Sequence, residues 1–233
     1  MSIINSKSKR VFLFDIDGTL LISDGAGSSS WTLAFEELYN ISADIFQYTD
    51  TGMTDQAIAK HTFEATMKRS ATEAELKELI EVRLRHLRET IHASAHFEIL
   101  TGVTELLTKL KATGAILGVV TGNLQLAAEM KLEKANLSSF FSFGGYGSDA
   151  YERVDLTQIA IDRCRDIYGA DLALDEFVAI GDTPNDVKAA HGCGIQCVGV
   201  GTHKYKREDL SEAGADFAID NLAEGLPMFG IIL

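Results

Sequence analysis

The chain has 233 residues, 46% of them hydrophobic, which is enough to bury one core of ordinary size and a small accessory domain. It carries 21 basic and 34 acidic side chains, and the resulting formal charge of −13 opposes binding to nucleic acid or to an anionic membrane. No apolar stretch approaches the roughly 20 residues of a membrane span, and the first apolar run is too short for a signal-peptide core. The three cysteines show no metal-binding spacing, so we expect reduced thiols and a cytoplasmic location.

The first predicted element is a short buried strand at residues 11–14, which ends in Asp15-Ile16-Asp17-Gly18-Thr19. In open α/β sheets, ligands bind at the carboxyl ends of the strands. Taken alone, Asp15 and Asp17 could also cap a turn or a helix.

Residues 23–97 show only helical spacing, and this segment is predicted to form a separate all-helical domain. Helices are expected at residues 31–39, 55–67 and 72–92. Thr72 and Glu75 predict a capping box at the start of the longest helix. Thr54 is placed to act as the N-cap of the helix expected at residues 55–67.

The rest of the chain alternates between strand and helix patterns, which predicts a doubly wound parallel sheet, a Rossmann-like α/β core made of residues 1–22 and 98–233. Strands are predicted at residues 115–120, 140–143, 177–180, 196–200 and 218–219, and helices at residues 103–110, 124–132, 156–167, 186–191 and 206–213.

A second acidic segment follows the strand at residues 177–180. It reads Gly181-Asp182-Thr183-Pro184-Asn185-Asp186, and Pro184 places Asp186 in the first turn of a helix. If the two strand ends meet, three or four carboxylates surround one position, and such an oxygen-only set favours Mg²⁺.

These motifs resemble those of the haloacid dehalogenase-like hydrolases, which are mostly phosphatases and mutases that act through an aspartyl-phosphate. The resemblance covers residues 11 to about 218. Asp15 to Thr19 match the first family motif and Gly181 to Asp186 match the fourth. The second motif, a Thr or Ser that ends an apolar strand, fits Thr121 before Gly122 and Asn123.

The third family motif, a Lys before a helix, has no match, because no Lys occurs between Lys134 and Lys188. Arg153 opens the helix in the corresponding segment and is predicted to take its place. Arg keeps the positive charge and can bind phosphate through two N–H groups.

The resemblance implies a role for each acidic residue. Asp15 would be the nucleophile, and Asp17 would protonate the leaving oxygen and later activate water. Mg²⁺ would be held by Asp15, Asp182 and the backbone carbonyl of Asp17, with Asp186 ligating directly or through water.

The resemblance also implies the groups that bind substrate. Thr121 and the N–H groups of Gly122 and Asn123 would hold a phosphoryl oxygen, while Arg153 offsets its charge. A helical insertion after the first strand is the small cap domain of this family, so residues 23–97 are expected to form a helical cap. Thr54 lies in a segment similar to the substrate-facing part of phosphoglycolate phosphatase-like caps.

The function that we expect is Mg²⁺-dependent hydrolysis of a small phosphomonoester, nearest to the phosphoglycolate phosphatase type, by a monomer or homodimer. Two alternatives remain open: a sugar phosphomutase of the same family, and a regulatory protein that binds a phosphorylated metabolite without turnover. Asp17 argues against dehalogenation, which needs no second acid.

Overall fold

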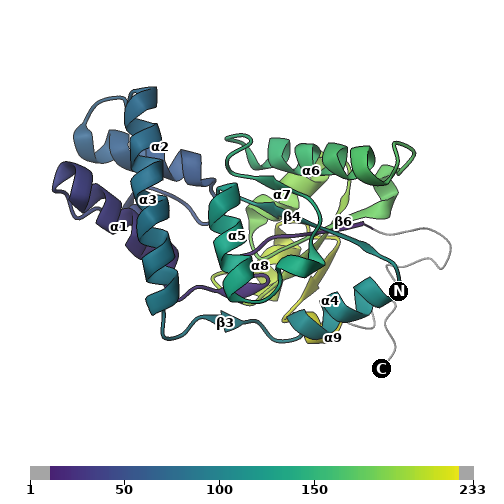
Figure 1. The fold of residues 1–233 in the computed structure, drawn as a ribbon. Helices are drawn as coiled ribbons and strands as arrows, with labels where there is room; N and C mark the ends of the chain where they lie inside the picture. The colour runs from purple at the N-terminus through teal and green to yellow at the C-terminus, as the bar shows by residue number, and fades with distance from the viewer. Residues whose placement is uncertain (1–10, 226–233) are drawn as a thin grey trace.

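The computed structural model describes residues 11–225. Its central element is a six-stranded parallel sheet with the strand order β5-β4-β1-β6-β7-β8. Figure 1 shows this core with a separate group of helices beside it. The strands are β1 (Val11–Phe14), β4 (Ile116–Thr121), β5 (Gly144–Tyr146), β6 (Phe177–Gly181), β7 (Gln196–Val200) and β8 (Phe217–Ile219). After β1 the chain builds β4 and β5 on one side, then returns to build β6 on the other. The carboxyl ends around β1 are therefore where a doubly wound sheet binds its ligand.

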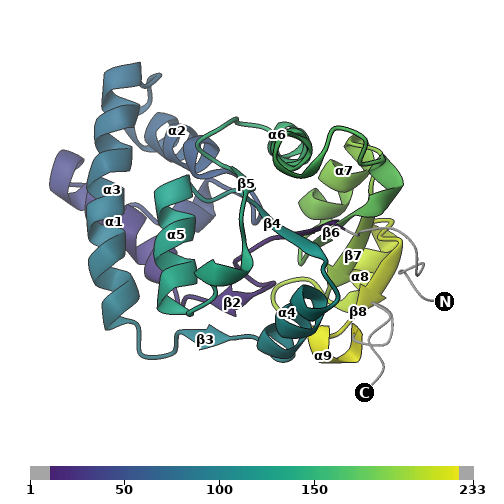
Figure 2. The same cartoon turned by 45° about the vertical axis from the view of Figure 1, so that its right-hand side comes forward.

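Helices cover both faces of this sheet because alternate residues of a strand point to opposite sides. Phe12 and Phe14 pack in one apolar cluster with α4 (Val103–Ala112), α5 (Gln125–Lys134) and α9 (Leu222–Gly225). Val11 and Leu13 pack in another with α6 (Arg153–Tyr168) and α7 (Pro184–Gly192). Figure 2 shows α6 and α7 on one side of the sheet and α4 and α9 on the other. The remaining helix of the core, α8 (Arg207–Glu212), packs on β7 and β8. The predicted doubly wound α/β core is thus confirmed.

Three helices are inserted after the short strand β2 (Leu21–Ile22), which pairs antiparallel with β3 (Glu98–Ile99) where the chain returns. They are α1 (Ala26–Tyr39), α2 (Asp55–Met67) and α3 (Glu73–Ala93), and we call them the cap. The cap has its own apolar cluster, built on Trp31, Phe35 and Phe63. The capping box of Thr72 and Glu75 is confirmed. The division of the chain at residues 23 and 97 stays a prediction.

The prediction of a strand at residues 140–143 was wrong. The segment contains a 3-10 turn (Ser138–Phe140), one of three such turns with Ile45–Gln47 and Leu174–Glu176 among the described residues, and the edge strand β5 begins only at Gly144. Two glycines form most of β5 because a Cβ at Gly145 would lie 2.0 Å from the carbonyl oxygen of Leu156 in α6. Glycine is depleted in strands, so residue propensities do not predict a strand at these positions.

None of the helices in residues 11–225 combines the length and the apolar character that a membrane crossing requires.

Candidate active site

A cavity of about 260 Å³ lies between the cap and the carboxyl ends of β1, β4 and β6. Its lining includes Asp15, Asp17, Asp182 and Arg153 from the core and Trp31 from the cap. The acidic residues predicted from two distant segments of the chain are therefore brought to one place.

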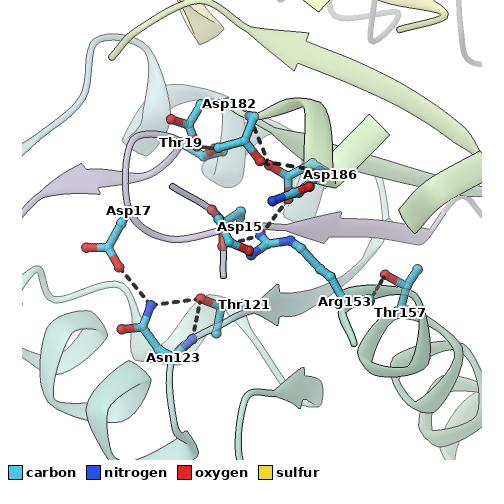
Figure 3. Close-up of polar contacts among 12 residues, drawn as sticks. Asp15, Asp17, Thr19, Thr121, Asn123, Arg153, Thr157, Asp182 and Asp186 are labelled. Atoms are coloured by element: carbon cyan, nitrogen blue, oxygen red, sulfur yellow. Dashed lines mark hydrogen bonds and ion pairs between the residues drawn. The ribbon is translucent and has the colours of Figure 1, made fainter. Parts of the chain in front are cut away.

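Asp15, Asp182 and Asp186 form a buried carboxylate triad, in which one oxygen of each lies within 4.8 Å of the others. Asp15 directly follows β1, Asp182 follows β6, and Asp186 lies in the first turn of α7, as predicted from Pro184 (Figure 3). One oxygen of Asp186 accepts hydrogen bonds from the N–H and hydroxyl of Thr183. Within residues 11–225, the carboxylate of Asp182 has only a 3.5 Å contact from the hydroxyl of Thr19. The carboxylate of Asp182 thus has fewer hydrogen-bond partners than that of Asp186.

Glycine permits this close approach of the two acidic segments. Gly18 adopts a φ of +80°, and a Cβ there would lie 2.2 Å from a carboxylate oxygen of Asp182. The carbonyl of Gly18 also accepts a hydrogen bond from the hydroxyl of Thr202. Any other residue at position 18 would strain the turn and displace Asp182.

Arg153 reaches the carboxylate triad from the first position of α6. Its Nη2 lies 2.9 Å from Oδ1 of Asp15 and 2.5 Å from Oδ1 of Asp186, and its side chain is 8% exposed (Figure 3). Its Nη1 donates to the carbonyl of Gly52 in the cap, while its buried Nε has no hydrogen-bond partner among the described residues. The structure thus places Arg153 against the carboxylate triad, and its role as the replacement for the family lysine stays a prediction.

The two other arginines of α6 lie elsewhere. Arg163 pairs with Asp149 at 2.7 Å, and Arg165 donates to the carbonyl of Leu172. Neither is among the residues that line the cavity.

Burial opposes ionisation of two members of the triad, Asp15 and Asp182. Burial raises the pKa of Asp15 to about 6; Arg153 opposes this increase, while Asp186 and Asp17 add to it. Burial, followed by the charges of Asp15 and Asp186, raises the pKa of Asp182 well above its ordinary value. Asp15 and Asp182 therefore resist ionisation together, and the three clustered carboxylates form a donor set that a hard divalent cation fits.

Asp17 has a different environment. Its side chain is 41% exposed, and its Oδ2 accepts hydrogen bonds from Nζ of Lys131 at 2.5 Å and from Nδ2 of Asn123 at 2.7 Å. Burial acts to raise the pKa of Asp17, but the charge and hydrogen bond of Lys131, with that of Asn123, hold it below its ordinary value. Asp15 and Asp17 therefore lie two positions apart in the sequence, but the pKa of Asp15 is raised and that of Asp17 is lowered.

The predicted phosphate-binding turn lies next to Asp17. Thr121 ends β4, and its hydroxyl oxygen accepts hydrogen bonds from the backbone N–H and the side chain of Asn123 (Figure 3). Gly122 and Asn123 line the cavity. The carbonyl of Gly122 accepts a hydrogen bond from the N–H of Asp55 at 2.7 Å, which ties the turn to the cap.

Thr54 is the N-cap of α2, because its hydroxyl oxygen accepts a hydrogen bond from the N–H of Ala57. The same hydroxyl donates to the carbonyl of Tyr151 in the core at 3.0 Å, and Thr54 is not among the cavity-lining residues. The substrate-facing role of Thr54 stays a prediction.

Two buried cations at the site were missed from the sequence. Arg83 of α3 pairs with Asp55 at 3.2 Å and lies 5.0 Å from the centre of the Trp31 ring, and the same Asp55 accepts a hydrogen bond from the N–H of Leu124. Lys131 is the other. Both cations line the cavity and lie on the apolar faces of their helices. Their spacing from the apolar residues of these helices was visible in the sequence and indicates that they are buried.

The fold and this arrangement define an α/β core with an acidic site under a helical cap, and the family assignment agrees with them. A family profile described as haloacid dehalogenase-like hydrolase matches residues 12–200, and the chain belongs to this family.

Similar proteins extend over nearly the whole chain. A phosphoglycolate phosphatase of Agrobacterium fabrum is 27% identical over 220 residues, covering 92% of this chain and 90% of the relative. A solved structure of a predicted phosphoglycolate phosphatase from Haemophilus somnus has a TM-score of 0.76 at 22% identity and covers 97% of this chain and 99% of its own. The structure of CbbY from Rhodobacter sphaeroides in complex with xylulose-(1,5)bisphosphate has a TM-score of 0.70 at 18% identity, covering 93% and 96%. The chain is therefore a hydrolase of this family, and several of its relatives are named phosphoglycolate phosphatases.

Proposed function

We propose that the protein is a Mg²⁺-dependent phosphatase that hydrolyses a small phosphomonoester through an aspartyl-phosphate on Asp15. The observation that carries this proposal is the contrast between two carboxylates of one loop. Asp15 lies among buried acids beside Arg153, whereas Asp17 is partly exposed and bound to Lys131 and Asn123. Pairs of carboxylates with opposite environments are typical of sites that divide nucleophilic and proton-transfer roles.

In the first step, a carboxylate oxygen of Asp15 attacks phosphorus while the bond from phosphorus to the leaving oxygen breaks. Asp17 gives a proton to that oxygen, and the alcohol departs. Lys131 lowers the pKa of Asp17, but the negative charge of a bound phosphoryl group acts in the opposite direction.

In the second step, Asp17 takes a proton from water, the oxygen of that water attacks phosphorus, and the bond from phosphorus to Asp15 breaks. Inorganic phosphate leaves and Asp15 is regenerated. Bound Mg²⁺, held by Asp15, Asp182, Asp186 and the carbonyl of Asp17, would neutralise charge on the phosphoryl oxygens.

Other residues of the site bind the phosphoryl group. The unpartnered buried Nε–H of Arg153 is a donor suited to a phosphoryl oxygen, since a buried donor without an acceptor is unfavourable. Thr121 and the N–H groups of the turn that follows would contact another oxygen.

The substrate class follows from the size of the site. A cavity of about 260 Å³ between the cap and the core fits a small phosphorylated metabolite. Phosphoglycolate is the first compound to test because several relatives are named for it. We expect a cytoplasmic monomer or homodimer.

A panel of small phosphomonoesters, assayed with Mg²⁺ and with EDTA, tests this proposal. We expect release of inorganic phosphate that depends on Mg²⁺. Saturable binding without phosphate release would instead indicate the regulatory alternative, and conversion of a sugar phosphate into its isomer would indicate a mutase.

A further inference from the structure

Lys131 is a buried cation on a helix face that otherwise carries small and apolar residues. It lies on α5 beside Ala127, Ala128 and Leu132, is 3% exposed and lines the cavity. An ammonium group is placed there at a large desolvation cost unless its partners compensate for it. The partners of Lys131 are therefore part of the reason for its position.

Those partners are both residues of the proposed reaction site. Its Nζ lies 2.5 Å from Oδ2 of Asp17 and 2.7 Å from Oδ1 of Asn123. Asn123 in turn donates to Oδ2 of Asp17 and to the hydroxyl of Thr121. Lys131 thus closes a network that joins the loop after β1 to the turn after β4.

The contacts of Asp17 are concentrated on one of its two oxygens. Oδ2 accepts hydrogen bonds from Lys131 and Asn123, whereas the only contact of Oδ1 in the described part of the chain is one of 3.4 Å with the hydroxyl of Ser23. The side chain of Asp17 is 41% exposed, whereas that of Lys131 is 4% exposed. Lys131 is therefore held in place by the packing around it, and it in turn holds Asp17. Without it, Asp17 would gain rotational freedom.

We propose that Lys131 is a positioning residue that fixes the carboxylate of Asp17 for proton transfer to the leaving oxygen. This inference rests on the proposed phosphatase function. In the step that it assists, the bond from phosphorus to the leaving oxygen breaks, and that oxygen takes its proton from Asp17. Lys131 itself forms and breaks no covalent bond.

Leaving groups of different basicity test the inference. An alkoxide leaves poorly without a proton, whereas p-nitrophenolate leaves readily without one. For Lys131→Met we expect kcat/KM for an alkyl phosphate that the parent hydrolyses to fall about 10²-fold, the usual size of a general-acid contribution. The value for p-nitrophenyl phosphate should change only a few-fold. We use kcat/KM because it reports the steps up to formation of the phosphoenzyme.

Two further variants provide the controls. Lys131→Arg keeps a cation near Asp17 and should recover part of the loss with the alkyl phosphate. Lys134→Met removes a lysine from the same helix, one that is exposed and lies 5.9 Å from the centre of the Phe97 ring, and should leave both substrates unchanged. Thermal melting of each variant reports whether the fold is retained.

A double-mutant cycle with Asp17→Asn tests whether Lys131 acts through Asp17. If it does, adding Lys131→Met to Asp17→Asn should cost little further activity on the alkyl phosphate. Equal losses on both substrates, or full additivity in the cycle, would overturn the positioning role while leaving the phosphatase function intact. Failure of the parent to hydrolyse any phosphomonoester would overturn the function, and the inference with it.

Discussion

The guanidinium of Arg153 lies 2.9 Å from the carboxylate of Asp15, which joins the start of α6 to the end of β1. The same nitrogen lies 2.5 Å from Asp186, so one arginine contacts two of the three clustered carboxylates. A buried cation that is shared in this way has both a structural and a chemical role, and the two can be separated by mutation.

Arg153→Ala should lower kcat/KM by about 10²-fold or more, because a charge at the transferring phosphoryl group is lost. Metal-free protein should also lose about 3–5 kcal/mol of stability, since the buried carboxylates lose their cation. Steady-state kinetics and urea unfolding in EDTA measure the two effects. Arg153→Lys should retain more activity than Arg153→Ala, and Arg163→Ala, which removes the arginine paired with Asp149, should leave kcat/KM near the parent value. Parent-like kinetics for Arg153→Ala would refute the role.

Asp182→Ala should weaken Mg²⁺ binding more than Asp186→Ala. The carboxylate of Asp182 has one long contact, whereas both oxygens of Asp186 are already engaged, by Arg153 and by Thr183. The less occupied carboxylate is the better direct ligand, and we expect its loss to weaken affinity about tenfold or more. Calorimetric titration with Mg²⁺ alone checks this without reference to activity. Equal affinity in parent and Asp182→Ala would remove Asp182 from the metal site.

The acid stability of the cap should depend on Glu75. Its hydrogen bond from Arg69, with those from Thr72, lowers the pKa of Glu75 to about 2, from an ordinary value of 4.5. Because the folded-state pKa is depressed, the stabilisation is complete above about pH 4.5 and is lost as pH falls towards about 2. Urea unfolding across this range should show a flatter profile for Glu75→Gln than for the parent, and the difference should shrink at high salt. Glu78→Gln, which removes an exposed carboxylate of the same helix, should follow the parent.

Gly122→Ala should prevent the cap from closing as it does here. A Cβ at position 122 would lie 2.5 Å from the backbone carbonyl oxygen of Met53, a contact that backbone movement must relieve. Because small displacements of a site are costly, kcat/KM should fall about tenfold or more. Gly27→Ala adds the same methyl group 3.9 Å from Nζ of Lys131, an ordinary contact, and should be much milder. Equal kinetics for the two variants would show that the close packing of Gly122 on the cap is not needed.

Much of the fold was predictable because most core elements combine a clear pattern of apolar residues with residues that mark where the element begins or ends. Residues 11–14 are apolar and end in Asp-x-Asp-Gly, and Pro184 marks the start of α7. The edge strand β5 was not predictable, because its glycines are required by close packing against α6, a tertiary constraint that propensity opposes.

The site was predictable to the extent that its residues lie at strand ends. Lys131 and Arg83 lie within helices, where a lone cation is usually read as solvent-exposed. Their signal was positional, since Arg83 shares a four-residue spacing with Leu79 and Leu87 on the buried face of α3. Only the fold shows that this face lies over a cavity with carboxylates.

The most direct test of the account is a search for the covalent intermediate on Asp15. Enzyme mixed with substrate and Mg²⁺ would be quenched in acid during turnover, treated with borohydride to reduce any acyl phosphate, and mapped by peptide mass spectrometry. We expect the reduced product at residue 15, and none in Asp15→Asn, which should keep its fold and lose hydrolysis. A reduced product at any other residue, or hydrolysis by Asp15→Asn near the parent rate, would contradict the central claim.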